Sequence, residues 1–185
     1  SSDAYPYEII TTLKGFHGRT LATLAATGQP EKQKFFLPMP QGFKHVPFNN
    51  LEAMTDAITK KTCAIMVEAI QGEGGVNVAD EEYLKGIRSL CDDNGLLLIL
   101  DEVQTGLGRT GKLFAHQHYA IEPDIMTLAK GLGSGFPIGV MVGSSKVSSV
   151  FAPGEHATTF GGAPLTSTVA ITTLQVLEEE WLVEN

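Results

Sequence analysis

The sequence predicts an α/β fold, a three-layer arrangement in which a mostly parallel sheet has helices on both faces. First, strand-like and helix-like segments alternate along the chain, which is typical of parallel strands joined by right-handed crossovers. Second, residues 96–100 (LLLIL) form a continuous apolar run that is too short for a helix and typical of a strand covered on both faces. Third, apolar side chains recur at helical spacing over residues 80–94 until Gly95 ends the pattern.

Shorter patterns predict the remaining elements. Asn50 can cap a helix that begins at Leu51. An earlier short helix stops at residues 28–30 (GQP). Residues 31–48 are rich in proline and show no clear period, so we predict a long loop there. The other expected elements are strands at 7–13, 63–70, 124–128 and 138–143, helices at 20–27, 51–60 and 164–180, and a loop at 71–75.

The composition is that of an ordinary globular protein. The chain has 185 residues, 43% hydrophobic and 18% charged, which predicts one sizeable domain. Its formal net charge is −8 and no basic stripe is present, which argues against nucleic acid and anionic membrane surfaces as partners. No apolar run approaches the roughly 20 residues that a membrane-spanning helix needs.

The cysteines and histidines give no sign of a disulfide framework or a metal centre. Cys63 and Cys91 both lie in apolar segments, which indicates reduced core cysteines in a cytoplasmic protein, with a disulfide between them as the less favoured alternative. No carboxylate or cysteine spacing turns the five histidines into a metal site. Residues 116–118 (His-Gln-His) are interpreted as a surface feature.

Asp101 is the first candidate for chemistry. It follows the apolar run directly, and open α/β sheets bind ligands at the carboxyl ends of their strands. A glycine-rich stretch at residues 105–111 follows and would let the backbone approach a ligand closely. Alone, an aspartate here would be a helix cap or a loop carboxylate. A buried one needs a cationic partner, and a protonated pyridine ring would serve.

Lys130 is the second candidate. It ends a strand-like apolar segment and precedes a turn with glycines at 131, 133 and 135. Burial there would favour the neutral amine, which attacks carbonyl groups. Alone, Lys130 would be a surface lysine, and the turn could bind a phosphate, although it lacks the G-x-G-x-x-G and Walker spacings. An aspartate and a lysine at two strand ends together match pyridoxal-phosphate sites, where the lysine forms the Schiff base and the acid holds the ring nitrogen protonated.

Five stretches in order then resemble one family, the class III aminotransferases of fold type I, and within it most closely the acetylornithine aminotransferases. They cover almost the whole chain, and their agreement in register is what makes the resemblance specific. The stretches are residues 16–21 (FHGRTL), 67–76 (VEAIQGEGGV), 101–111 (DEVQTGLGRTG), 123–130 (PDIMTLAK) and 158–162 (TTFGG).

The resemblance implies roles for individual residues. For the cofactor, Lys130 and Asp101 are catalytic, Phe16 and Val103 press on the two faces of the ring, Glu102 belongs to the same binding segment, Gln104 hydrogen-bonds the ring hydroxyl and Thr159 contacts the phosphate. For the substrate, Arg19 grips the α-carboxylate with its bidentate fork, while Glu68, Glu73 and Thr158 line the binding site. Glu73 corresponds to a switch glutamate that pairs with an arginine until a dicarboxylate displaces it.

The resemblance also implies an activity and an assembly. The expected reaction moves an amino group from N-acetylornithine, or a related ω-amino acid, to 2-oxoglutarate in arginine biosynthesis, so the partners are small amino and 2-oxo acids. The threonine at 159 reaches a neighbouring subunit in this family, which implies a homodimer. Residues 1–185 are expected to be most of the cofactor-binding large domain, without the N-terminal segment and the C-terminal small domain.

Other readings stay open. One is a different enzyme on this scaffold, such as an ornithine, succinylornithine or 4-aminobutyrate aminotransferase, another ω-transaminase, an aminomutase or a racemase. The region around Arg19 and the loop at 72–74 favour the first reading, and a panel of substrates would separate them. The other is a non-catalytic fragment that binds partners or only dimerises.

Overall fold

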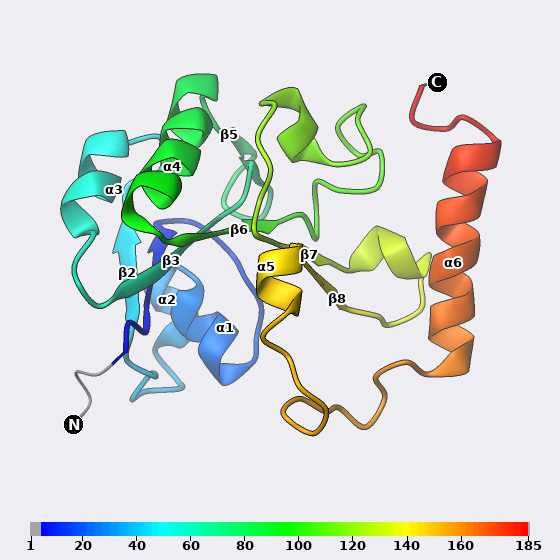
Figure 1. Cartoon of the computed structure of the whole chain (residues 1–185), viewed down its shortest axis with the longest axis horizontal. Coiled ribbons are helices and arrows are strands. Elements are labelled where there is room, and N and C mark those ends of the chain that lie inside the picture. The colour runs from blue at the N-terminus through cyan, green and yellow to red at the C-terminus, as the bar shows by residue number, and fades with distance from the viewer. Residues whose placement is uncertain (1–4, 185) are drawn as a thin grey trace. The chain divides into compact units, whose positions relative to one another are not determined.

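The computed structural model describes residues 5–184 and divides into two compact units, Ser1–Leu100 and Asp101–Asn185 (Figure 1). The residues at 1–4 and 185 lie outside the described part of the chain. The expectation that residues 1–185 form most of one cofactor-binding domain stays a prediction.

The first unit is built on four parallel strands. Their order is β2-β1-β3-β6, and each neighbouring pair runs in the same direction. A short antiparallel pair, β4 with β5, follows β3. The strands are β1 (Glu8–Thr12), β2 (Phe43–Val46), β3 (Thr62–Val67), β4 (Ile70–Gln71), β5 (Asn77–Val78) and β6 (Leu97–Asp101), and the helices are α1 (Leu21–Ala26), α2 (Pro30–Gln33), α3 (Leu51–Ala57) and α4 (Glu81–Asn94).

Helices cover both faces of this sheet, as predicted. Successive side chains of a strand point to opposite faces. On β2 the Lys44 ammonium donates to the carbonyl of Ala57 at the end of α3, whereas the neighbouring His45 ring bonds the carbonyl of Ala25 in α1. The helices α1 and α3 therefore lie on opposite faces. Figure 1 shows α3 and α4 together on one side and α1 and α2 together on the other.

The core of the first unit lies between these layers. The β6 run has two fully buried side chains, Leu98 and Leu100, and two partly buried ones, Leu97 and Ile99, as expected for a strand covered on both faces. Burying one such side chain contributes about 1.5–3 kcal/mol. The other large, fully buried side chains of this unit include Ile10, Leu24, Met54, Ile65, Val67, Leu84 and Ile87, together with the polar Thr11 and Gln71.

The predicted helix signals are confirmed where they are local. The Asn50 side chain accepts a hydrogen bond from the Ala53 amide at 2.8 Å, which caps α3. Gly95 ends α4 in the left-handed conformation at φ 66°, which glycine adopts without a steric penalty. The predicted apolar face of α4 is buried through Tyr83, Leu84, Ile87 and Cys91.

The long loop predicted at residues 31–48 is wrong where α2 and β2 form within it. The earlier helix does end before residues 28–30, because α1 ends at Ala26, but Pro30 occupies the first position of α2, where its missing N–H costs nothing. Residues 43–46 form β2, which lies at the edge of the sheet and pairs only with β1. Its residues are mostly half-buried and two are polar, so the segment lacked the apolar signal of a central strand.

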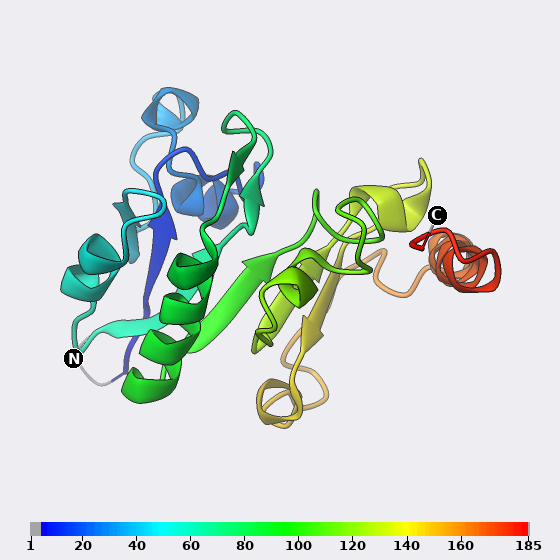
Figure 2. The same cartoon turned by 90° about the horizontal axis from the view of Figure 1, so that it is seen from above.

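The second unit is smaller and less enclosed. Its core consists of Met126, Leu128, Leu132 and Ala170. Helix α6 packs against the 3-10 helix Lys130–Gly133 and is seen nearly end-on in Figure 2. Its elements are the strands β7 (Ile125–Leu128) and β8 (Val140–Gly143), which pair antiparallel, the helices α5 (Ser145–Ser148) and α6 (Pro164–Glu179), and two 3-10 helices, Ala115–His118 and Lys130–Gly133.

Two further findings concern the cysteines and the length of the helices. Cys63 and Cys91 are free thiols, as predicted, and burial raises the pKa of the Cys63 thiol. Between residues 5 and 184 no helix combines the length and apolar character that crossing a membrane requires.

Candidate active site

Asp101 and Lys130 lie at the ends of β6 and β7. The Glu102 amide, next to Asp101, donates to the Thr127 carbonyl of β7 at 3.0 Å, so the two chain segments are neighbours. Asp101 is 7% exposed, and its Oδ1 accepts from the Val103 amide at 3.1 Å. The predicted acid is therefore a buried carboxylate at a strand end, held by its own loop.

Lys130 differs from its prediction in one respect. It is exposed, so the expected burial is wrong for this chain. In the strand before it, half-buried and buried residues alternate, and the 3-10 helix that begins at Lys130 follows after one residue. Its backbone has φ 45°, in the left-handed region that a residue with a side chain rarely adopts. Such a conformation costs on the order of 1–3 kcal/mol and is concentrated at functional sites.

Glu102 is the most enclosed charged side chain of the second unit's described part, at 2% exposed. Its carboxylate accepts from the Thr105 hydroxyl, the Ala115 amide (3.1 Å), the His116 amide (2.9 Å) and His116 Nδ1 (3.1 Å). Burial alone would raise the pKa of this carboxyl, but the hydrogen bonds from His116 and Thr105 outweigh it and lower the pKa below its ordinary value. The interpretation of residues 116–118 as a surface feature is confirmed for Gln117 and His118, which are exposed, but is wrong for His116, which is half-buried against Glu102.

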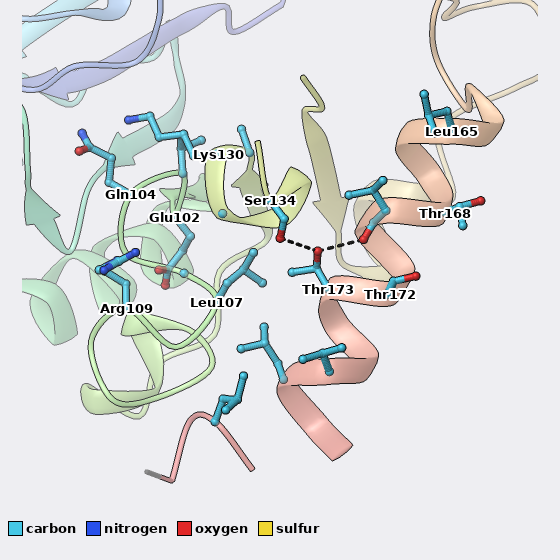
Figure 3. A pocket seen from close by; sticks show the side chains of 18 residues that line it. Glu102, Gln104, Leu107, Arg109, Lys130, Ser134, Leu165, Thr168, Thr172 and Thr173 are labelled. Carbon is cyan, nitrogen blue, oxygen red and sulfur yellow. Dashed lines mark hydrogen bonds between the residues drawn. The ribbon is translucent and has the colours of Figure 1, made fainter. Parts of the chain in front are cut away.

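A cavity of about 800 Å³ in the second unit contains four of the predicted residues in its lining: Glu102, Val103, Gln104 and Lys130. Its other wall is α6, with apolar and threonine side chains (Figure 3). The ends of the Lys130 and Gln104 side chains point to the same side, away from α6. The predicted cofactor residues therefore lie on the wall of the cavity that faces α6.

Thr158 and Thr159 lie apart from this cavity. Both are exposed in the segment between α5 and α6, and neither lines the cavity. Their predicted contacts to substrate and phosphate stay predictions.

The first unit brings its predicted residues together around Phe16. The Phe16 amide donates to Glu68 Oε2 at 3.0 Å, and Glu68 is 3% exposed. The exposed Arg19 guanidinium lies 5.5 Å from the centroid of the Phe16 ring, within the range of a cation–π contact. The Lys32 ammonium lies 5.9 Å from the same centroid. Two cations therefore flank one aromatic ring.

Glu73 joins this cluster through Lys32. The Lys32 ammonium contacts Glu73 Oε1 at 2.7 Å, and the Gln29 amide donates to Glu73 Oε2 at 2.6 Å. The hydrogen bonds from Lys32 and Gln29, with the charges of Lys32 and Arg19, lower the pKa of Glu73. The resemblance implied an arginine as the partner of Glu73, and that role stays a prediction beside the observed pair with Lys32.

We expect the Glu73–Lys32 pair to make stability weakly dependent on pH. Because the pKa of Glu73 is lowered on folding, its contribution is present above the unfolded-state pKa and is lost as pH falls through the folded one. A double-mutant cycle with Glu73→Gln and Lys32→Met, measured by urea unfolding at pH 7, should give a coupling of about 0.2–1 kcal/mol because the pair is partly exposed.

The Glu81–Lys85 pair on α4 is a matched control, since it joins the same residue types at the exposed i,i+4 spacing. Its coupling should not exceed that of Glu73–Lys32. A zero coupling for Glu73–Lys32 at pH 7, or a coupling that does not fall when the pH is lowered far enough to protonate Glu73, would contradict a stabilising ion pair.

The sequence did not reveal the partners of the predicted acids. Gln29, Lys32, Thr105 and His116 were not predicted to take part in the site. The first two stand at the N-cap and the third helical position of α2, a helix that the loop prediction had removed. Within residues 5–184 no group of three or more histidine, cysteine, aspartate or glutamate residues could hold a metal ion.

Comparison with known proteins identifies the family of this chain. The family model for aminotransferase class-III matches residues 4–185. The acetylornithine aminotransferase of Methanocaldococcus jannaschii is 56% identical over 172 residues, which are 93% of this chain and 43% of that protein. The enzyme of the same name from Caldanaerobacter subterraneus subsp. tengcongensis is 54% identical over 179 residues, covering 97% and 45% of the two chains. The chain spans less than half the length of these relatives.

Solved structures agree with the fold. The ornithine aminotransferase of Toxoplasma gondii ME49 superposes with a TM-score of 0.91 at 39% identity, over 96% of this chain and 42% of that one. A transaminase from the marine bacterium Virgibacillus gives a TM-score of 0.92 at 34% identity, over 99% and 45%. Another structure of the Toxoplasma enzyme has partial occupancy of pyridoxal phosphate (PLP) at its active site. With a family match over nearly its whole length, this chain belongs to the class III aminotransferases.

Proposed function

We propose that this chain carries the covalent lysine and the ring-nitrogen acid of a PLP-dependent transaminase, Lys130 and Asp101. The carrying observation is that both stand at the ends of neighbouring strands, the acid buried and the lysine in a left-handed conformation. The residues present fit the cofactor: a buried carboxylate suits a protonated ring nitrogen, and an exposed amine suits an aldehyde.

The other residues of the second unit have proposed roles at the cofactor. Val103 would press on one face of the ring and Gln104 would bond the ring hydroxyl, since both line the cavity wall that also carries Lys130. Thr159 would contact the phosphate. The exposed position of Thr158 and Thr159 suits contacts to a neighbouring subunit, so we propose a homodimer.

The first unit would bind the ring and the substrate. Phe16 would stack on the ring, and Glu68 would fix its backbone through the 3.0 Å hydrogen bond. The exposed Arg19 would bind a substrate carboxylate with its two-pronged guanidinium. Glu73 is paired with Lys32 and would leave that pair when the second carboxylate of a substrate arrives. Lys32 and Arg19 both lie beside Phe16, so either cation could receive that carboxylate.

Proton transfer would belong to Lys130. When bound, PLP supplies the electron sink for the negative charge that develops at the substrate carbon. The Lys130 Nζ would remove the proton from that carbon as a general base and then deliver it to the former aldehyde carbon of the cofactor as a general acid. Asp101 would keep a proton on the ring nitrogen, and its buried position keeps its carboxylate away from bulk water.

We propose N-acetylornithine as the amino donor and 2-oxoglutarate as the acceptor, in a cytoplasmic step of arginine biosynthesis. The names of the relatives support the donor. The test uses a chimera in which this chain replaces the matching stretch of the Methanocaldococcus jannaschii relative. With 2-oxoglutarate as acceptor, N-acetylornithine should give a higher kcat/KM than ornithine, succinylornithine and 4-aminobutyrate.

The two parts of the proposal have different contrary outcomes. If the chimera prefers ornithine, the proposed transaminase activity stands and the proposed donor, N-acetylornithine, is wrong. A folded chimera that binds PLP but transfers no amino group from any of the four donors would contradict the transaminase itself. The parent relative, assayed beside it, shows that the conditions support the reaction.

A further inference from the structure

We infer, on the basis of the proposed function, that Glu102 is a positioning residue rather than a ligand of the cofactor. It anchors the glycine-rich segment 103–114 and thereby holds Asp101 and Val103 in the orientation that the cofactor needs. The family resemblance implied that Glu102 binds the cofactor, because it lies between Asp101 and Val103 in the sequence.

The carboxylate of Glu102 has no acceptor capacity left for a ligand. An ionised carboxylate offers about four lone-pair sites. Oε2 accepts from the Thr105 hydroxyl and the Ala115 amide, and Oε1 accepts from the amide and Nδ1 of His116. All four donors come from the protein. A cofactor contact would have to displace one of them inside a site that is 2% exposed.

The main chain of Glu102 is engaged as well. Its amide donates to the Thr127 carbonyl at 3.0 Å, and its carbonyl accepts from the Gly106 amide at 2.9 Å. One residue therefore ties together β7, the start of the loop and the 3-10 helix at 115–118. These bonds also fix the backbone of its two neighbours, Asp101 and Val103. The Val103 amide in turn donates to Asp101 Oδ1 at 3.1 Å.

The segment that follows needs such an anchor. Leu107, Gly108 and Gly111 have φ values of 56°, 83° and 85°, a left-handed backbone whose glycines keep much freedom when unfolded. The far end of the segment is held by His116, whose ring stacks on Phe114 with centroids 5.6 Å apart and planes within 9°. Since the ionised Glu102 can only accept, His116 Nδ1 carries the hydrogen.

The test separates an anchor from a ligand. Glu102→Gln keeps the shape of the side chain but turns one acceptor oxygen into a donor group, which opposes the protein's donors. Thr105→Val removes one donor only and is the milder variant if Glu102→Gln folds poorly. Glu178→Gln, on the exposed face of α6, is the control for loss of one glutamate charge in the same unit.

The first readout needs no cofactor. In the 185-residue chain, amide hydrogen exchange over residues 103–116 should become at least about ten-fold faster in Glu102→Gln. The reason is that losing the hydrogen bonds to the charged carboxylate should raise the population of the locally open segment by about that factor. Thr105→Val should give a smaller increase and Glu178→Gln none. Unchanged exchange in Glu102→Gln would overturn the anchoring role.

The second readout is PLP binding by the chain and by the chimera. Glu102→Gln should weaken the apparent Kd about ten-fold or more and shift the absorption band of bound PLP, because Asp101 and Val103 lose their orientation. Faster exchange with unchanged affinity and band would reduce Glu102 to a structural residue and overturn the inference. If the unmutated chimera binds no PLP, the proposed function fails, while the exchange result still decides whether Glu102 anchors the loop.

Discussion

Replacing Lys130 with alanine is expected to abolish the covalent attachment of PLP to this protein. The unmutated chain, or the chimera, should show an absorption band with PLP that borohydride converts into a permanent adduct of matching mass. Lys130→Ala should show neither, and peptide mapping of the unmutated protein should place the adduct on the peptide that contains Lys130. The effect should be complete because alanine has no amine that could form the Schiff base with the aldehyde of PLP.

The structure gives this expectation its physical basis. Lys130 begins a 3-10 helix with φ 45°, and its amine points away from α6, to the same side as the end of the Gln104 side chain (Figure 3). An exposed lysine without a site would react with PLP no better than its neighbours. The strained backbone, which costs on the order of 1–3 kcal/mol, indicates that the position of this side chain is constrained.

Lys112 is the matched control, because it is an exposed lysine of the same unit. Lys112→Ala should bind and fix PLP like the unmutated protein. Labelling spread evenly over several lysines, Lys112 included, would contradict a dedicated site at Lys130. If the chain alone gives no band but the chimera does, the stretches that the relative supplies are needed for the site.

The sequence predicted the elements whose signal is local. A continuous apolar run defines β6, and the cap residues Asn50 and Gly95 mark helix ends through their own hydrogen bonds or backbone freedom. Asp101 and Lys130 could be placed because strand ends are visible in such patterns. The edge strand β2 was missed because its stability comes from pairing with β1, which no neighbour in the sequence reveals.

The partners of the site acids are non-local and could not be predicted for the same reason. Glu73 meets Gln29 across 44 positions, and Glu102 meets His116 across 14. Exposure depends on the whole surroundings too, which is why Lys130 was expected to be buried and is not. Val140, Met141 and Val142 on β8 are likewise exposed although the strand is apolar, so this strand leaves apolar surface uncovered.

Asp101→Asn should leave PLP attached but remove most of the transamination activity. The two side chains have the same shape, and the asparagine oxygen can still accept from the Val103 amide, so the loop should keep its structure. What is lost is the charge that keeps the ring nitrogen protonated. Removing one partner of a buried charge pair costs roughly 2–5 kcal/mol, which corresponds to a fall in kcat of about 30-fold to several thousand-fold.

The chimera is the protein for this measurement, with kcat for N-acetylornithine and 2-oxoglutarate and the apparent Kd for PLP determined together. Asp92→Asn is the control, because Asp92 is an exposed partner of Arg88 on α4 and its loss should change neither value. A kcat within about three-fold of the unmutated chimera would exclude Asp101 as the ring-nitrogen acid, since that is under 1 kcal/mol. A large loss of PLP affinity at unchanged kcat would instead assign Asp101 to binding, because an interaction made equally in the ground and transition states leaves kcat unaltered.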